Sequence, residues 1–141
     1  VGSEMCIRDR CTVTNYHQLK QIIAQNNIHT IYHAAAYKHV PMVEMNVVSG
    51  TYNNVIGTYN VAKLADELEV ESMVLVSTDK AVRPTNIMGA SKRLAELIVQ
   101  VYAKGKEGNS INSLPKTIFL SSTFNVSETR TTVLPSTVKL P

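Results

Sequence analysis

A chain of 141 residues is long enough for one domain with a hydrophobic core, and 44% hydrophobic and 18% charged residues are ordinary for a globular protein. The net charge of +3 is too small to predict a nucleic-acid partner or a membrane surface. The two cysteines, Cys6 and Cys11, lack the spacing of a disulfide framework or a zinc site, and no apolar run approaches the roughly 20 residues that span a bilayer.

Residues 1–10 show no apolar period, and they lack the apolar stretch of roughly 7–15 residues that a signal peptide needs. Their sequence looks like the in-frame translation of a transposase adapter used to build sequencing libraries. We therefore expect residues 1–11 to be an adapter-derived scar that takes no part in the fold. A short disordered tail is the alternative.

Two helices and one strand are predicted next. Apolar positions at helical spacing predict an amphipathic helix over residues 16–27, with Asn15 as its N-cap. Residues 28–35 form a short apolar run with two isoleucines, which is typical of a buried strand. A second helix is expected over residues 50–68, where apolar residues again recur at helical intervals.

The alternation of strands and helices then continues. Residues 73–76 are predicted to form a second buried strand, and a long helix is expected over residues 86–103, capped by Thr85 or Asn86. A third strand is predicted at residues 117–120. The apolar face of the long helix is formed by Leu94, Leu97, Ile98 and Val101.

Residues 12–120 are therefore interpreted as one α/β domain, and residues 121–141 as a diverged or frame-shifted tail that is rich in Ser and Thr. Strands that alternate with helices imply right-handed crossovers and a parallel sheet with helices on both faces. Ligands of such folds lie beyond the carboxyl ends of the strands. Two polar clusters, residues 37–39 and residues 77–80, fall at such ends, which supports a site there without naming its chemistry.

The second cluster places a hydroxyl, an acid and a base where a buried strand opens into a loop. Its residues are Ser77, Thr78, Asp79 and Lys80. A buried lysine beside an aspartate could have a shifted pKa and act in proton transfer. A solvated strand end is the alternative, because polar residues are common at such positions.

Met88 and Lys92 are four residues apart and share one face of the predicted helix. Short-chain dehydrogenases have a tyrosine and a lysine at this spacing, downstream of a strand-end Ser or Thr. Here Met88 fills the tyrosine slot and cannot transfer a proton, so a simple dehydrogenase is not expected. Tyr59 and Lys63 show the same spacing but lie in the preceding helix, with no Ser-bearing strand end upstream, and we interpret them as a coincidence.

Three stretches in order carry a specific resemblance: residues 33–41 (HAAAYKHVP), residues 54–58 (NVIGT) and residues 77–93 (STDKAVRPTNIMGASKR). Over about residues 12–120 the chain resembles the CapD-like polysaccharide biosynthesis family. These proteins are the UDP-N-acetylglucosamine 4,6-dehydratases of the extended short-chain dehydrogenase superfamily. A methionine in the tyrosine slot is similar to the larger, membrane-anchored branch of that family.

The resemblance implies a mechanism for a nucleotide-sugar substrate. A hydride moves from C4 of the sugar to NAD (NAD+ or NADP+), the C5 proton is removed, water is lost from C6, and the hydride returns to C6. By matching position, Lys80 would be the C5 base, Asp79 the acid for water loss, and Thr78 the hydroxyl near C4, with Ser77 beside it. With Met88 in the tyrosine slot, the base for C4 is not identified.

The resemblance also implies how the cofactor is held, with Lys92 on the nicotinamide ribose and Asn54 as a brace for the strand ends. The residues implied to line the cofactor are Ala34, Ala35, Lys38, Asn54, Ser77 and Lys92. Without the resemblance, His33 and His39 are interpreted as structural histidines rather than ligands, and no metal site is expected.

A dinucleotide fold opens with a strand, a Gly-rich turn and a helix that binds the pyrophosphate. No G-x-G-x-x-G occurs in this chain, so we expect a partial Rossmann-like, doubly wound sheet without that first unit. Residues 123–126 match the family's Arg-Phe-Gly-Asn-Val element only in part. The segment alone is therefore expected to be inactive. Its parent is expected to be a homo-oligomer with a cytoplasmic catalytic domain, and a membrane anchor in the parent stays open.

Three alternatives remain. A nucleotide-sugar epimerase or reductase of the same superfamily would be favoured by a tyrosine at position 88, so Met88 disfavours it. A non-catalytic NAD-binding domain is disfavoured because Asp79, Lys80 and Lys92 are all retained. A sheet too incomplete to fold alone, with edges left unpaired, is compatible with an active parent.

Overall fold

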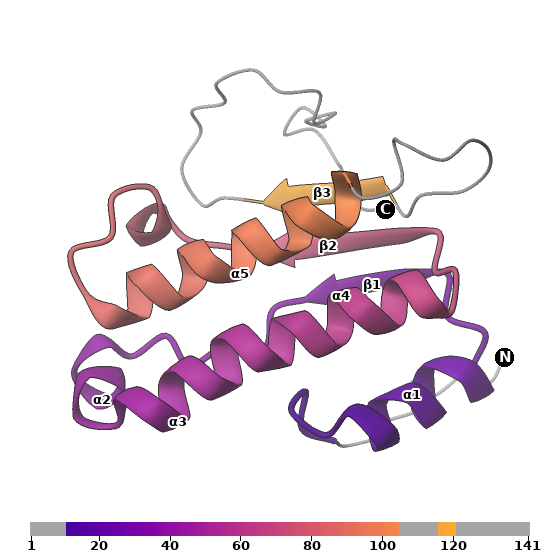
Figure 1. The fold of residues 1–141 in the computed structure, drawn as a ribbon, viewed down its shortest axis with the longest axis horizontal. Coiled ribbons are helices and arrows are strands. Elements are labelled where there is room, and N and C mark those ends of the chain that lie inside the picture. The colour runs from indigo at the N-terminus through magenta and orange to yellow at the C-terminus, as the bar shows by residue number, and fades with distance from the viewer. Residues whose placement is uncertain (1–10, 105–115, 121–141) are drawn as a thin grey trace, which may run out of the picture.

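Three parallel strands in the order β1-β2-β3 form the centre of the computed structural model, which describes residues 11–104 and 116–120, and side chains within 11–103 (Figure 1). The strands are β1 (Thr30–His33), β2 (Ser72–Val76) and β3 (Lys116–Leu120). Thr30 pairs with Ser72, and Leu75 pairs with Phe119. The three predicted strands and their parallel pairing are confirmed. The predicted scar at residues 1–10 and the predicted tail at residues 121–141 lie outside the described residues.

The helices that precede and connect these strands differ in length. They are α1 (Tyr16–Gln25), α2 (Val40–Met45), α3 (Val47–Thr51), the π-helical segment η1 (Tyr52–Ile56), α4 (Gly57–Glu67), the 3₁₀ turn η2 (Asp79–Ala81) and α5 (Ile87–Lys104). The Asn15 side chain accepts a hydrogen bond from Gln18 N at 3.2 Å, so the predicted N-cap of α1 is confirmed. Asn86 Oδ1 accepts from Gly89 N at 2.8 Å, so Asn86 rather than Thr85 caps α5.

The helix predicted over residues 50–68 begins earlier than expected and is not regular. α3, η1 and α4 follow one another without a break from Val47 to Glu67, and η1 is a π-helical segment. A π segment inserts extra backbone into the turn and rotates the side chains that follow, and such segments are common at functional sites. The separate helix α2 was not predicted. Its second residue, Pro41, suits the first turn of a helix, where a missing N–H costs nothing.

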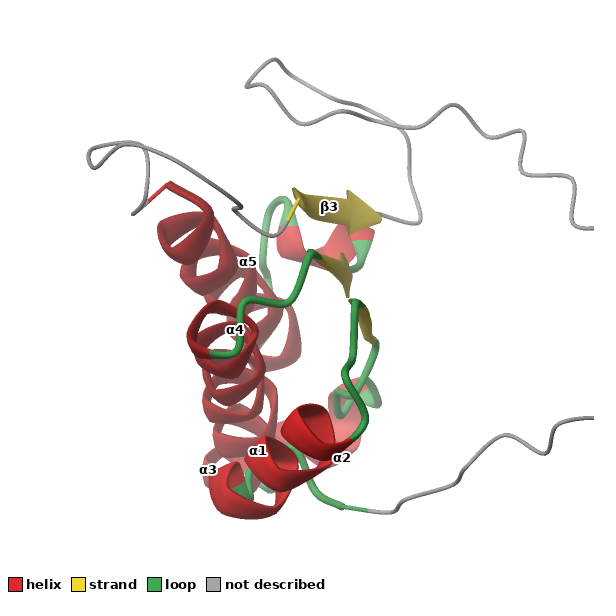
Figure 2. Ribbon diagram, turned by 90° about the vertical axis from the view of Figure 1, so that its right-hand side faces the viewer, coloured by secondary structure: helices red, strands yellow, loops and turns green. Residues whose placement is uncertain are grey.

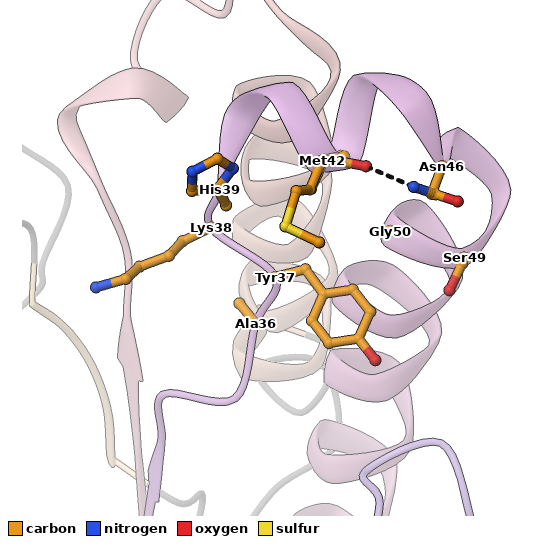
Figure 3. Close-up of a pocket in the computed structure, with 9 residues that line it drawn as sticks. Ala36, Tyr37, Lys38, His39, Met42, Asn46, Ser49 and Gly50 are labelled. Atoms are coloured by element: carbon orange, nitrogen blue, oxygen red, sulfur yellow. Dashed lines mark hydrogen bonds between the residues drawn. The ribbon is translucent and has the colours of Figure 1, made fainter.

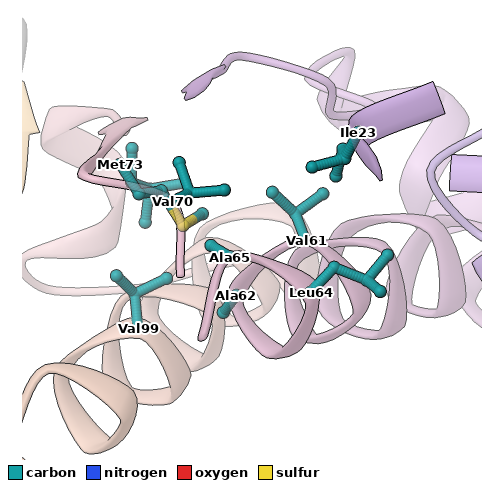
Figure 4. Close-up of a cluster of buried hydrophobic side chains, with 9 residues drawn as sticks. Ile23, Val61, Ala62, Leu64, Ala65, Val70, Met73 and Val99 are labelled. Atoms are coloured by element: carbon teal, nitrogen blue, oxygen red, sulfur yellow. The ribbon is translucent and has the colours of Figure 1, made fainter. Parts of the chain in front are cut away.

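One apolar cluster holds α1, α4, α5 and β2 together (Figure 4). Leu64 of α4, Leu75 of β2 and Val99 of α5 are each no more than 1% exposed. Ile23 of α1 and Met73 of β2 complete the contact between the helices and the sheet. Burial of each such side chain stabilises the fold by about 1.5–3 kcal/mol relative to leaving it exposed.

The helices α4 and α5 lie together on one face of the sheet (Figure 2). Successive crossovers that run in one direction and are all right-handed place their helices on the same face. On the opposite face Tyr32 is 74% exposed and Val76 is 39% exposed, and no helix within residues 11–104 covers them. The prediction of helices on both faces is thus met on one face only by the residues that the structure describes.

The outer surface of α5 is unusually apolar. Leu94, Leu97 and Val101 share one face as predicted, but they are 41–68% exposed, and the buried face carries smaller side chains such as Ala95 and Val99. Small residues let α5 approach α4 and the sheet closely, which leaves the leucines on the outside. None of the helices in the described part of the chain combines the length and the hydropathy that a membrane span requires.

Candidate functional site

The two polar clusters predicted at strand ends lie at the same edge of the sheet. β1 leads into residues 34–39 and β2 leads into η2, while the first turns of α5 pack against η2. The packing is close enough that a Cβ atom on Gly89 would lie 2.5 Å from the backbone oxygen of Lys80. The tyrosine-slot helix and the Asp79–Lys80 turn are therefore positioned by direct backbone contact.

The turn after β2 presents a hydroxyl, an acid and a base together. Thr78 Oγ1 donates to Asp79 Oδ1 at 2.9 Å, and the same carboxylate oxygen accepts from the Lys80 backbone N–H at 3.0 Å. Asp79 and Lys80 are exposed, so the suggestion of a buried lysine beside an aspartate does not hold here. Exposure leaves both side chains able to reach a bound substrate.

Met88 and Lys92 lie on the inner face of α5, where they are 2% and 8% exposed. The Lys92 ammonium donates to the backbone oxygen of Val76 at 3.1 Å, so it is held at the end of β2. Burial lowers the pKa of Lys92, and the Glu96 carboxylate acts in the opposite direction. A buried ammonium at a strand end can donate to hydroxyl groups of a ligand bound there.

Asn54 in η1 connects the loop after β1 to helix α5. Its side chain accepts from Tyr37 N at 2.7 Å and donates to Tyr37 O at 3.0 Å, and it also donates to Ser91 Oγ at 3.0 Å. Ser91 Oγ in turn donates to the Met88 backbone oxygen at 2.7 Å. The loop after β1 is thus tied to α5 through one amide that is 1% exposed. Sequence reasoning missed Ser91, whose only signal was its place between Met88 and Lys92.

His33 is buried beside this network. Its Nε2 lies 2.9 Å from Thr58 Oγ1, and Thr58 Oγ1 donates its single hydrogen to Asn54 O at 2.7 Å. Nε2 must therefore carry the hydrogen that Thr58 accepts, which assigns the neutral tautomer. Burial, helped by the charge of Lys92, lowers the pKa of His33 to about 4. This is the satisfied structural histidine expected from the sequence.

The buried neutral His33 predicts acid sensitivity. Its pKa is about 4 in the fold, against 6.5 for an unperturbed histidine, so the unfolded chain binds a proton first as the pH falls. The free energy of unfolding should decrease by about 3 kcal/mol between pH 6.5 and pH 4 through this residue. Urea unfolding of the full-length protein across this range, compared with a His33→Gln variant, isolates the contribution. The exposed His29→Gln change is the control, and equal pH slopes for wild type and His33→Gln would contradict the prediction.

A separate cavity of about 440 Å³ lies between the loop after β1 and helices α2 and α3 (Figure 3). Lys38 and His39 line it with Tyr37 and Met42, and the Lys38 side chain extends away from the Tyr37 ring. Of the residues implied to bind the cofactor, Lys38 alone lines this cavity, while Ala34 and Ala35 are exposed beside it. The cavity is therefore not the predicted site as a whole.

Comparisons with known proteins place this geometry in context. The family model described as "Polysaccharide biosynthesis protein" matches residues 4–140. The chain is 43% identical over 124 residues to the capsular polysaccharide biosynthesis protein CapD of Staphylococcus aureus, covering 87% of the chain and 19% of that protein. It is 44% identical over 108 residues to the probable polysaccharide biosynthesis protein EpsC of Bacillus subtilis, covering 76% of the chain and 17% of that protein. A UDP-glucose 4-epimerase of Rickettsia bellii is 34% identical over 87% of the chain and 34% of its own length.

Solved structures give the same fold. The X-ray structure of Pen from Bacillus thuringiensis superposes with a TM-score of 0.67 at 33% identity, covering 79% of the chain and 32% of Pen. The dTDP-4-dehydrorhamnose reductase from Bacillus anthracis, in complex with NADP, superposes with a TM-score of 0.64 at 26% identity, covering 79% of the chain and 40% of the reductase. The predicted Rossmann-like α/β class is confirmed, and the chain spans about a fifth of the length of CapD and EpsC.

Proposed function

The chain belongs to the polysaccharide biosynthesis protein family, and on that basis we propose that it is the catalytic segment of an NAD-dependent nucleotide-sugar 4,6-dehydratase. The substrate we propose is of the UDP-N-acetylglucosamine type, used in bacterial surface-glycan biosynthesis. One observation carries the proposal: Thr78, Asp79 and Lys80 share an exposed turn beside the buried Lys92. Because the chain spans only part of its relatives, the activity is proposed for the full-length protein that contains this segment.

The residues at the strand ends fit one half of a dinucleotide. Ala34 and Ala35 present small side chains after β1, and the Lys92 ammonium can donate to ribose hydroxyls at the end of β2. The pyrophosphate half has no counterpart in this sequence, because no Gly-rich turn is present. When bound, the cofactor supplies a hydride acceptor at C4 and a hydride donor at C6. The proposed cofactor is a nicotinamide dinucleotide, NAD+ or NADP+.

The turn after β2 supplies the proton transfers of this proposal. Lys80 removes the C5 proton once C4 is oxidised, and Asp79 protonates the C6 oxygen as it leaves as water. Thr78 places its hydroxyl near C4, and its bond to Asp79 holds the carboxylate in the turn. Met88 takes no part in proton transfer, and its buried side chain fills the tyrosine slot.

A nucleotide-sugar epimerase is the second candidate, and its support is the relative named UDP-glucose 4-epimerase at 34% identity. Met88 disfavours it, because an epimerase of this superfamily needs an acid–base group in that slot. The relative named CapD also favours a role in polysaccharide synthesis without stating a reaction.

Deuterium at C4 of UDP-N-acetylglucosamine distinguishes the two reactions. A dehydratase is expected to release a 4-keto-6-deoxy product with the deuterium at C6 and without accumulation of reduced cofactor. An epimerase would return a C4-inverted sugar with the deuterium still at C4. Mass spectrometry and NMR of the products of the full-length protein make this measurement, and retention of deuterium at C4 would exclude the dehydratase. The segment of 141 residues alone is expected to give no product.

We also propose that the full-length protein is a homo-oligomer with its catalytic domain in the cytoplasm. The exposed apolar side chains on α5 support the oligomer, since Leu94, Leu97 and Val101 form one continuous apolar face. A membrane anchor outside this segment is compatible with a relative named as an uncharacterized membrane protein, MJ1061 of Methanocaldococcus jannaschii, at 42% identity over 84% of the chain.

A further inference from the structure

Glu96 lies on α5 one turn after Lys92 and contacts Ser77 at the strand-end site. The sequence analysis did not include Glu96 in that site. Ser77 Oγ donates a hydrogen bond to Glu96 Oε1, across from the end of β2 to the helix. Glu96 Oε2 accepts from Arg93 Nη1 at 2.9 Å, and the Glu96 side chain is 13% exposed. Both carboxylate oxygens are thus engaged, and the carboxylate is largely removed from water.

The same strand end holds Lys92. Its ammonium donates to the backbone oxygen of Val76, the residue directly before Ser77. Lys92 and Glu96 are four residues apart, so they are neighbours on one face of α5. One face of α5 therefore contacts two consecutive residues at the end of β2. Lys92 hydrogen-bonds to Val76, and Glu96 hydrogen-bonds to Ser77.

Charge reinforces this arrangement. Burial lowers the pKa of Lys92, and the Glu96 carboxylate raises it. The charged or titratable groups on α5 and the described elements that pack against it include Glu96 and Arg93 on α5, Glu44 on α2, Tyr52 on η1, Tyr59, Lys63, Asp66 and Glu67 on α4, and Asp79 and Lys80 on η2, while His33 lies on β1. His33 is neutral near pH 7 because its pKa is about 4. Glu96 is the carboxylate among them whose charge acts on the ammonium.

We propose that Glu96 is a positioning residue of the dehydratase site, which fixes the Ser77 hydroxyl and places a negative charge on the same helix face as the Lys92 ammonium, where that ammonium meets the nicotinamide ribose. This inference rests on the proposed function for its chemistry, and on the two hydrogen bonds at the end of β2 for its geometry. In the sequence, Glu96 is visible only as a glutamate four residues after Lys92. This spacing alone does not distinguish a positioning residue from one half of a surface ion pair.

Glu96→Gln tests the charge while keeping the shape. Gln retains an acceptor for Ser77, but Lys92 loses the opposing carboxylate and its pKa falls further. Activity that needs the ammonium is lost as the pH rises through that pKa, so the alkaline limb of the kcat profile should move to lower pH. Glu96→Asp keeps the charge and should keep the limb near that of the wild type. Glu71→Gln, at the amino end of β2, is the control for loss of one exposed carboxylate.

Two measurements on the full-length protein keep this test separate from the proposed function. If the wild type dehydrates the sugar and Glu96→Gln shows an unshifted alkaline limb, the role of Glu96 is overturned and the proposed function stands. If the wild type binds NAD without dehydrating the sugar, the proposed function fails, and the pH dependence of NAD affinity decides the role of Glu96 by the same shift. Thermal unfolding of each variant identifies misfolding, in which case Glu96→Asp against the wild type carries the comparison.

Discussion

Replacement of Lys80 by Met in the full-length protein is expected to lower the kcat of the proposed dehydratase reaction by about 10²–10⁴-fold, the usual contribution of a positioned general base. Lys80 lies in the turn η2, where its backbone N–H donates to Asp79 Oδ1 and its side chain is exposed. Methionine keeps the length of the side chain and removes the ammonium. Product formation, followed as the 4-keto sugar, measures the loss.

The step that fails identifies the role of Lys80. Oxidation at C4 does not need the C5 base, so Lys80→Met should still form reduced cofactor on the enzyme but should not exchange the C5 proton with solvent deuterium. Asp79→Asn should exchange the C5 proton and fail to lose water. Lys20→Met, which removes a lysine paired with Glu67, is the matched control. Wild-type exchange at C5 in Lys80→Met would show that another group is the base.

Gly89→Ala is expected to reduce kcat by about 10²-fold, because a displacement of about 1 Å at a catalytic group has an effect of that size. A Cβ at this position would lie 2.5 Å from the Lys80 backbone oxygen and 3.3 Å from its carbonyl carbon. Backbone cannot rotate away as a side chain can, so the Asp79–Lys80 turn has to shift. The conformation of Gly89 is not the constraint, since no glycine in the described residues has a positive φ.

Stability gives an independent measurement of the same clash. Alanine in place of glycine within a helix normally stabilises it by up to about 1 kcal/mol, whereas overpacking costs about 1–3 kcal/mol. Gly89→Ala should therefore lower the melting temperature of the full-length protein. Gly57→Ala is the control, because its Cβ would meet the Val13 side chain rather than backbone. If Gly89→Ala and Gly57→Ala have equal kcat, the close packing of η2 on α5 does not control the position of the Asp79–Lys80 turn during catalysis.

Local patterns were sufficient for much of the fold. Alternation of apolar runs and helical periods predicted β1, β2, β3, α1 and α5, because each of these elements buries one repeating set of side chains. The alternation of strands and helices then predicted parallel pairing, and chirality predicted right-handed crossovers. The irregular region from α2 to η1 was not predicted correctly, since a π-helical segment interrupts the helical period and α2 is only six residues long.

The candidate site was likewise predicted only in part from the sequence. The family resemblance carried by the ordered motifs implied Thr78, Asp79, Lys80 and Lys92 as one group, and the structure packs the turn of Asp79 and Lys80 against α5, which carries Lys92. It did not predict the exposure of Lys80, because burial depends on what packs against a residue from distant parts of the chain.

The sequence by itself determined the family, the class of fold and the chemical groups at the two strand ends. Only the tertiary structure decided how those groups are held: Asn54 spans from the loop after β1 to Ser91, and Glu96 spans from α5 to Ser77. Local periodicity describes which side of an element faces inward. A hydrogen bond between residues 37 positions apart depends instead on the relative placement of two elements, which is set by packing and not by either segment alone.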